Sequence, residues 1–364
     1  MKTLKIFALP SHQTKERTSG VDFVRIIQPM KHLDGFEYKG YKFKTNVFDI
    51  HSKKNPLWDD VAKEHDIIFL NYIGNAWAFA AMGCMARKFK RKIVFDLDDS
   101  LWDILKDNTA YKVYHKGSEA LVNFTSMCDE VDYMLCTNTY LRNIIVFNTY
   151  KTHQEVGIIP NYIDFKYYNH RSKFKDSLDI KLMHFGSTTH FISLQNEEFE
   201  KGIDRIFKEY PNVTFKTVGA FIPKYKSKWG ARYEHGYGHM DVHKWIKDKF
   251  PGYMDEADII LAPLEDNKYN RCKSSIKFLE ASSAKKPGVW QNIRQYKEIV
   301  TEKNGLLADD ADGWYENIKK LINDKKLRKN TGENAFKTVK GWQIQNNVKK
   351  YAEMFIDIDN NYQL

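Results

Sequence analysis

The stretch that decides the fold is Ala257–Glu280, which reads ADIILAPLEDNKYNRCKSSIKFLE. Its apolar run Asp258–Ala262 predicts a buried parallel strand that ends at Pro263. A polar loop follows, and Ser274 and Ser275 then open a helix whose first N–H groups have no partner inside the helix. Because the N-terminus of a helix favours anions, this strand–loop–helix unit predicts a diphosphate site.

Two charged residues accompany this helix in the sequence. Lys273 directly precedes the serines and adds a positive charge beside the expected phosphates. Glu280 lies about a turn and a half further along the helix, where a carboxylate accepts two hydrogen bonds from a ribose diol. An ordinary serine N-cap followed by a surface glutamate explains the same residues, and the pattern alone leaves both explanations open.

Outward from this unit, apolar strands alternate with helices twice along the chain. We expect strands at Leu4–Leu9, Phe43–Ile50, Asp66–Tyr72, Lys92–Leu97, Val131–Thr137, Gly157–Pro160, Ile180–Gly186, Val213–Val218, Asp258–Ala262, Pro287–Gln291 and Gly305–Ala308. We expect helices at Val21–Leu33, Ala76–Lys88, Thr139–Asn148, Asn196–Glu209, Ser274–Ala284 and Gly313–Asn323, with two more before Leu364. The alternation predicts an α/β protein with two Rossmann-like domains whose parallel sheets face each other across a cleft.

Composition agrees with two globular domains in 364 residues, of which 42% are hydrophobic and 29% charged. The formal net charge of +10 favours anionic partners, although a general excess of lysine explains it equally well. The four cysteines form no CxxC pair, which predicts free thiols. We find no signal peptide and no apolar stretch long enough to span a membrane, so we expect a soluble cytoplasmic protein.

The run 257–339 resembles the donor-binding region of GT-B glycosyltransferases, in particular the large retaining group called family 4. The resemblance rests on ADIILAPL, NRCKSSIKFLEASSAKKPGVW, EIVTEKNGLLA and GWYENIKKLINDKKLRKNTGENAF. In that family the helix carries two glutamates eight positions apart, and Glu280 matches the second, which binds the donor ribose. The first would fall at Cys272. This departure, shared by a subgroup with NRxKSxxKxLE, leaves open how the hydroxyls of the donor sugar are held.

Further segments of the second half resemble the same family. Met183–His190 (MHFGSTTH) resembles the first strand and glycine turn of the donor domain. The resemblance implies that Gly186, Ser187 and Thr188 offer donors to phosphate. The family often has Arg and Lys after this turn, whereas this chain has Thr189 and His190.

The region of Val218, Gly219 and 237–240 resembles the part of the donor domain that contacts the nucleotide base. Of the histidines, His190 and His239 are the best candidates for polar contacts in the cleft, because they follow strand-end or glycine turns. A lone histidine more often has a structural role.

In the first half, 18–25 (TSGVDFVR) resembles the loop that opens the first helix and lies against the donor phosphates and the acceptor. Gly20 would let the backbone approach the ligand closely. Arg25, one turn into the helix, is a candidate for donor binding and equally for an ion pair. The run 160–164 (PNYID) resembles the turn between the domains.

Asp98 and Asp99, in the run FDLDD, follow an expected strand and therefore face the cleft. Such carboxylates can orient or deprotonate an acceptor hydroxyl, cap the next segment, or bind a metal with a nucleotide-sugar. Metal-bound nucleotide-sugar is typical of a glycosyltransferase fold with one main sheet. We therefore expect no metal and no cofactor besides the nucleotide-sugar co-substrate.

The resemblance implies transfer of a sugar from a nucleotide-sugar, with UDP as the commonest nucleotide, to a hydroxyl acceptor with retention. It implies an acceptor-binding domain at 1–172, a donor-binding domain at 173–340, and a C-terminal helix at 341–364 that packs back on the first domain. Two runs, SGVDFVRIIQPMKHL and FDLDD, also resemble transferases of large bacteriophages, which would place the protein in the host cytoplasm.

We therefore hypothesise that the acceptor is a 5-hydroxymethylpyrimidine in double-stranded phage DNA, because basic clusters such as 87–92 (RKFKRK) and 224–228 (KYKSK) suit phosphates. The same clusters suit lipid headgroups. A cell-surface glycan or lipid-linked acceptor therefore stays open, as does a non-catalytic nucleotide- or carbohydrate-binding protein. The oligomeric state is not predicted.

Overall fold

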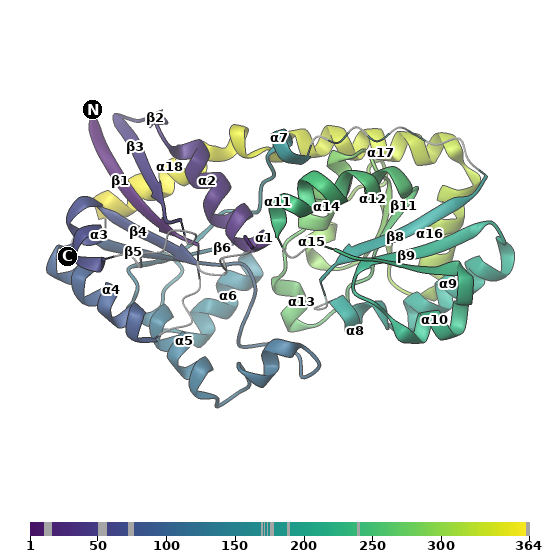
Figure 1. Cartoon of the computed structure of the whole chain (residues 1–364), viewed down its shortest axis with the longest axis horizontal. Coiled ribbons are helices and arrows are strands. Elements are labelled where there is room, and N and C mark those ends of the chain that lie inside the picture. Colours follow the sequence, from purple (N-terminus) through teal and green to yellow (C-terminus); the bar gives the residue numbers. More distant parts are fainter. Residues whose placement is uncertain are drawn as a thin grey trace.

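The computed structural model describes residues 1–10, 17–49, 57–71, 76–168, 170, 172, 174, 178–187, 190–238 and 241–361. Within these ranges the chain forms two α/β lobes, each built on its own sheet, which lie side by side in Figure 1. This arrangement confirms the prediction of two parallel-sheet units.

The first lobe contains a sheet with the strand order β2-β3-β1-β4-β5-β6-β7. The strands are β1 Lys2–Leu9, β2 Glu37–Tyr38, β3 Tyr41–Val47, β4 Ile67–Asn71, β5 Lys92–Leu97, β6 Tyr133–Cys136 and β7 Val156–Ile158. Only β2 among these strands pairs in the antiparallel sense, with β3. All five residues of β4 are buried, as expected for a central parallel strand covered on both faces.

The helices of this lobe are α1 Gly20–Asp22, α2 Gln28–Leu33, α3 Trp58–Glu64, α4 Ala76–Lys88, α5 Glu119–Glu130 and α6 Thr139–Asn148. A π-helical turn at Phe23–Ile27 joins α1 to α2, so the expected helix at 21–33 is continuous but locally widened. The helix α5 was not predicted, although its N-cap Ser118 accepts a hydrogen bond from the backbone N–H of Leu121 in the usual way.

The second lobe contains a parallel sheet with the order β10-β9-β8-β11-β12-β13. Its strands are β8 Ile180–Gly186, β9 Val213–Gly219, β10 Tyr233–Gly236, β11 Ile259–Ala262, β12 Gly288–Gln291 and β13 Leu306–Ala308. The edge strand β10 was missed because its sequence, YEHG, contains no apolar run. Its two middle residues are only partly buried.

Helices surround this second sheet and continue to the C-terminus. They are α7 Phe165–Tyr168, α8 Phe191–Leu194, α9 Glu197–Glu209, α10 Pro223–Trp229, α11 Val242–Lys244, α12 Phe250–Glu256, α13 Lys268–Cys272, α14 Ile276–Ser283, α15 Arg294–Lys297, α16 Ala311–Asn323, α17 Lys325–Val339 and α18 Ile344–Asn361. In the described part of the chain, no helix has the length and hydropathy needed to cross a membrane.

The last helix, α18, returns from the second lobe to the first, as Figure 1 shows in yellow. Its Tyr351 and Phe355 are buried in the apolar core behind β1 and β4, and the ring of Phe355 contacts that of Phe69 edge-on at 5.4 Å between centroids. The predicted domain limits at 172 and 340 stay predictions. The first falls in a stretch that is only partly described, and the second follows the end of α17.

Candidate functional site

The candidate site lies where β8 and β11 end beside each other in the second sheet. These strands are parallel neighbours, with Ile260 opposite Met183. The glycine turn after β8 and the loop after β11 therefore leave the sheet at the same edge, where open α/β sheets bind ligands. The helix α14 begins at this edge, and Ser275 at its N-cap makes no side-chain capping bond.

Three polar side chains converge on Gly186 at this edge. A Cβ atom at Gly186 would lie 2.9 Å from Lys277 Nζ, 2.9 Å from His190 Cδ2 and 3.2 Å from His184 Nε2. These side chains come from α14, from the turn before α8 and from β8 itself. Glycine is needed here for space, since its φ lies outside the left-handed region.

The candidate Gly219 has a steric role in this arrangement. Its φ of 97° lies in the left-handed region, and a Cβ atom would come within 2.2 Å of the carbonyl oxygen of Gly186. Only glycine lets the end of β9 approach the Gly186 turn so closely. The role of Gly219 in the structure is therefore to allow the close contact between the end of β9 and the Gly186 turn.

Two histidines beside the turn are neutral, the buried His184 and the half-buried His190. His184 is fully buried, its Nδ1 lies 2.9 Å from the carbonyl oxygen of Leu261, and burial together with the charge of Lys277 lowers its pKa to about 3. Nδ1 therefore carries the proton, and the lone pair of Nε2 is left as an acceptor. Burial also lowers the pKa of His190 well below its usual value. Both His184 Nε2 and His190 Nδ1 are buried without a hydrogen-bond partner among the described residues.

Lys277 and Glu280 lie one turn apart on α14, and each is forced toward its neutral form. Burial lowers the pKa of Lys277 to about 8 and outweighs the attraction of Glu280. Burial likewise raises the pKa of Glu280 to about 7, against the effects of Lys277 and of the Tyr168 hydroxyl. Lysine and glutamate side chains whose charges are not fully balanced by neighbouring groups are typical of a ligand-binding site when they lie at the carboxyl edge of a sheet.

Lys273 joins this group from the loop before α14 and reaches the first lobe. Its Nζ lies 3.1 Å from Asp99 Oδ2 in the first lobe and 4.5 Å from the centre of the Tyr269 ring. Asp99 thus holds an ammonium group, while Asp98 is half-buried beside it. In the described residues, no group of three or more His, Cys, Asp or Glu side chains is arranged to hold a metal ion.

The guanidinium group of Arg25 bonds to other protein groups instead of pointing a donor at this edge of the sheet. It is fully buried and forms a bidentate ion pair with Asp96, at 2.9 Å from Nε and 2.5 Å from Nη2. Its Nη1 donates to the carbonyl oxygen of Ile159 and to Asn161 Oδ1. Asn161 Nδ2 in turn donates to Ser274 Oγ at 2.8 Å. Of the two explanations left open by the sequence, the structure favours the ion pair.

The remaining candidate residues are exposed or lie outside the described part of the chain. Ser187 is exposed in the turn after Gly186. Gly20 is exposed at the start of α1, and a Cβ atom there would meet nothing within 4 Å. Thr188 and His239 lie outside the described residues.

The lobes are joined by contacts that the sequence did not predict. The backbone N–H of Thr18 donates to Asp241 Oδ2 at 2.8 Å, and its carbonyl oxygen accepts from the N–H of Val242 at 2.9 Å. Asn138 Nδ2 donates to the carbonyl oxygen of Cys272 at 2.6 Å. Asp241 and Asn138 are ordinary helix N-caps by sequence, so nothing in their local pattern reveals a partner in the other lobe.

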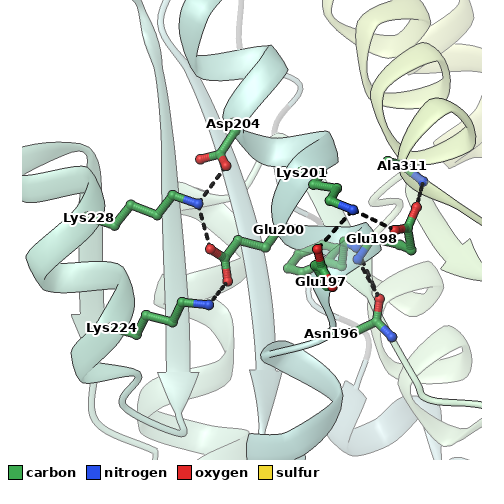
Figure 2. A network of polar contacts seen from close by, with 10 residues as sticks. Asn196, Glu197, Glu198, Glu200, Lys201, Asp204, Lys224, Lys228 and Ala311 are labelled. Carbon is green, nitrogen blue, oxygen red and sulfur yellow. Dashed lines mark hydrogen bonds and ion pairs between the residues drawn. The ribbon is translucent and has the colours of Figure 1, made fainter.

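Carboxylates pair with most side chains of the basic clusters that suggested a nucleic-acid partner. Figure 2 shows Lys228 between Glu200 and Asp204, with Nζ–O distances of 2.5 and 2.6 Å, and Lys224 on the second oxygen of Glu200 at 2.6 Å. In the other cluster the pairs are Arg87–Glu130, Lys88–Asp59, Arg91–Asp66 and Lys92–Asp132. These side chains therefore offer a phosphate backbone less charge than the sequence suggests.

Replacing Gly186 by alanine tests the convergence on this turn. The new Cβ would displace the flexible end of Lys277 and the ring of His190, whereas the backbone can stay in place. We expect the protein to fold with a loss of about 1–3 kcal/mol and to bind the nucleoside diphosphate expected from the sequence at least tenfold more weakly, because about 1.4 kcal/mol of lost contact has that effect. Thermal unfolding and calorimetric titration measure the two quantities. Gly341→Ala, at an open position, is the control; equal affinity of both variants for the nucleoside diphosphate would contradict the placement.

Comparisons with known proteins identify a related family model and similar folds. Residues 191–324 match the family model described as Glycosyl transferases group 1. No curated protein sequence matches the chain. Among solved structures, Anabaena HepE in complex with UDP-glucose has a TM-score of 0.64 and 13% identity, covering 97% of this chain and 100% of HepE.

Sucrose-phosphate synthase from Thermosynechococcus elongatus has a TM-score of 0.63 and 12% identity, with 98% of this chain and 99% of that chain covered. TarM has a TM-score of 0.59 and 13% identity over 81% of this chain, which spans 55% of TarM. These similarities show that the chain has the GT-B fold, which confirms the fold predicted from the sequence.

Proposed function

We propose that this chain is a metal-independent glycosyltransferase that moves a hexose from a UDP-sugar to a hydroxyl acceptor. The observation that carries the proposal is that the Gly186 turn, the start of α14 and Glu280 lie together at the carboxyl edge of the second sheet. A diphosphate suits the turn and the helix N-terminus, and a ribose suits Glu280. The family match over 191–324 and the fold shared with a UDP-glucose complex support this assignment.

The reaction breaks the bond between C1 of the sugar and the diphosphate and forms a bond from C1 to the acceptor oxygen. Negative charge gathers on the leaving diphosphate, and the α14 N-terminus and the Lys273 ammonium group stabilise it. Asp99 fixes Lys273 from the opposite lobe, so this ion pair between the lobes holds the cation beside the leaving group. The acceptor proton passes to the departing phosphate, which gives attack from the same face and retention at C1.

The acceptor binds on the side of the first lobe, where β5 ends at Asp98 and Asp99. The hydroxymethylated base of phage DNA stays a prediction from the sequence, as does a cytoplasmic location. The pairing of both basic clusters weakens the electrostatic argument for DNA. The experiment incubates the protein with labelled UDP-glucose and, in separate reactions, hydroxymethylcytosine DNA, a glycan extract or a lipid extract. The fraction that takes up the label identifies the acceptor.

Glu280→Gln tests the donor site itself. The variant keeps the shape of the side chain but loses the carboxylate that accepts the ribose hydroxyls, so we expect UDP-glucose to bind at least tenfold more weakly at pH 8. Because the pKa of Glu280 is raised to about 7, wild-type affinity should fall as the pH drops below 7, and the variant should lose this acid limb.

Calorimetric titration of UDP-glucose between about pH 6 and about pH 8 measures the effect of Glu280→Gln, around the pKa given above. The exposed Glu302→Gln in the same lobe is the matched control. If Glu280→Gln and Glu302→Gln bind equally well, the ribose does not lie on Glu280. If the wild-type protein binds no nucleotide-sugar, the proposed function is wrong.

A further inference from the structure

We propose that Lys277 is the cation that binds the diphosphate at the Gly186 turn, and that His184 is the positioning residue that orients its ammonium group. This inference rests on the proposed function and names the part of the site that sequence patterns did not reveal. It makes donor affinity depend on the protonation of one half-buried lysine.

The first argument is that the sequence of the turn itself contains no positively charged side chain. The segment 186–190 reads GSTTH and contains neither Lys nor Arg. His190 is neutral, because burial and nearby lysines lower its pKa well below its usual value. The positive charge that faces a diphosphate at this turn must therefore come from another element. Lys277 Nζ, at 2.9 Å from the place of a Gly186 Cβ, is in that position.

The second argument is the orientation of His184. Its Nδ1 donates to the carbonyl oxygen of Leu261 at 2.9 Å, which fixes the ring on β8. The unprotonated Nε2 has no partner among the described residues and lies on the same side of Gly186 as Lys277 Nζ. A buried imidazole lone pair accepts a hydrogen bond from an ammonium group and repels a phosphate oxygen. With a diphosphate bound, His184 Nε2 accepts one N–H of Lys277 and leaves the other two for the ligand.

The charged groups around Lys277 determine the sign of the pH dependence. Glu280 on its own helix and Asp99 in the first lobe favour its protonation, whereas Lys273 and burial oppose it. His184, His190 and the Phe185 ring, whose centre lies 5.6 Å from Nζ, complete the surroundings and carry no charge. The pKa of Lys277 is lowered to about 8, so its charge is present below pH 8 and is lost as the pH rises through that value.

The test is titration of UDP-glucose, whose diphosphate does not change charge in this range, from about pH 7 to about pH 9, which spans the pKa of Lys277. Wild-type affinity should weaken progressively above pH 8. Lys277→Met should bind about 10–100-fold more weakly at pH 7, with no alkaline limb. Lys277→Arg should recover most of this loss and also lack the alkaline limb, because arginine stays charged.

His184→Phe tests the positioning role separately. The ring fills the site but offers no acceptor, so the alkaline limb should move to lower pH while the affinity at pH 7 falls about threefold to tenfold. Lys320→Met, at an exposed position on α16, is the control and should behave as wild type. Thermal unfolding shows whether each variant is folded. If His184→Phe is not folded, the recovery and pH profile of Lys277→Arg still decide the role of Lys277.

Two results would overturn the inference without affecting the proposed function. The first is a Lys277→Met variant that binds like the wild type while Glu280→Gln is weakened. The second is a Lys277→Arg variant that keeps the alkaline limb. If the wild-type protein binds no UDP-glucose at any pH, the proposed function itself fails, and that outcome is distinct from both.

Discussion

Replacing Arg25 by methionine is expected to lower the free energy of unfolding by about 3–5 kcal/mol. The side chains of Arg25 and Asp96 are both fully buried, and their ion pair is bidentate. Methionine fills much of the volume but leaves the Asp96 carboxylate without a counterion in the core. The carbonyl oxygen of Ile159 and Asn161 Oδ1 also lose a donor.

Denaturant unfolding of the Arg25→Met variant and the wild type measures this loss. Arg87→Met is the matched control, since the Arg87–Glu130 pair is more than half exposed at both ends and should contribute about 0–1 kcal/mol. The double variant Arg25→Met/Asp96→Leu should recover part of the loss, because it removes the stranded carboxylate. A loss below about 1 kcal/mol for Arg25→Met would contradict the role assigned to this pair.

The second large effect concerns Lys273. Lys273→Met should lower kcat/KM for sugar transfer by about 100–1000-fold, because an ammonium group beside the leaving diphosphate stabilises charge that develops in the transition state. The variant also loses the ion pair with Asp99 that links the lobes. We expect the loss to appear mostly in kcat, since the charge on the diphosphate grows as the bond to C1 breaks.

Steady-state kinetics of sugar transfer, or of UDP-glucose hydrolysis while the acceptor is unidentified, measure the effect of Lys273→Met. The control is Lys268→Met, which removes an exposed lysine of the neighbouring helix α13. Lys273→Arg should keep part of the activity because it retains the charge. A loss of less than about tenfold for Lys273→Met would show that this lysine is not beside the leaving group.

Much of the fold follows from the sequence because parallel strands are buried on both faces. Apolar runs such as 92–97 and 180–186 predict β5 and β8 residue for residue. The same reasoning failed for β10, an edge strand whose residues YEHG include no apolar run. A central strand is determined by its own residues, whereas an edge strand is determined by the neighbour with which it pairs.

The candidate site was predictable where its residues belong to one local segment. Lys273, Ser274 and Glu280 share the strand–loop–helix unit that Ala257–Glu280 specifies. The roles of Arg25 and Lys277 depend on partners far away in the chain. Arg25 pairs with Asp96, 71 residues on, and Lys277 Nζ approaches the turn at Gly186.

The most direct test of the donor site is a crystal structure of the protein with UDP. We expect the β-phosphate between the Gly186 turn and the start of α14, within hydrogen-bond distance of Lys277 Nζ, and both ribose hydroxyls on the carboxylate of Glu280. A nucleotide bound away from the carboxyl edge of β8 and β11, or a ribose that does not contact Glu280, would contradict the assignment.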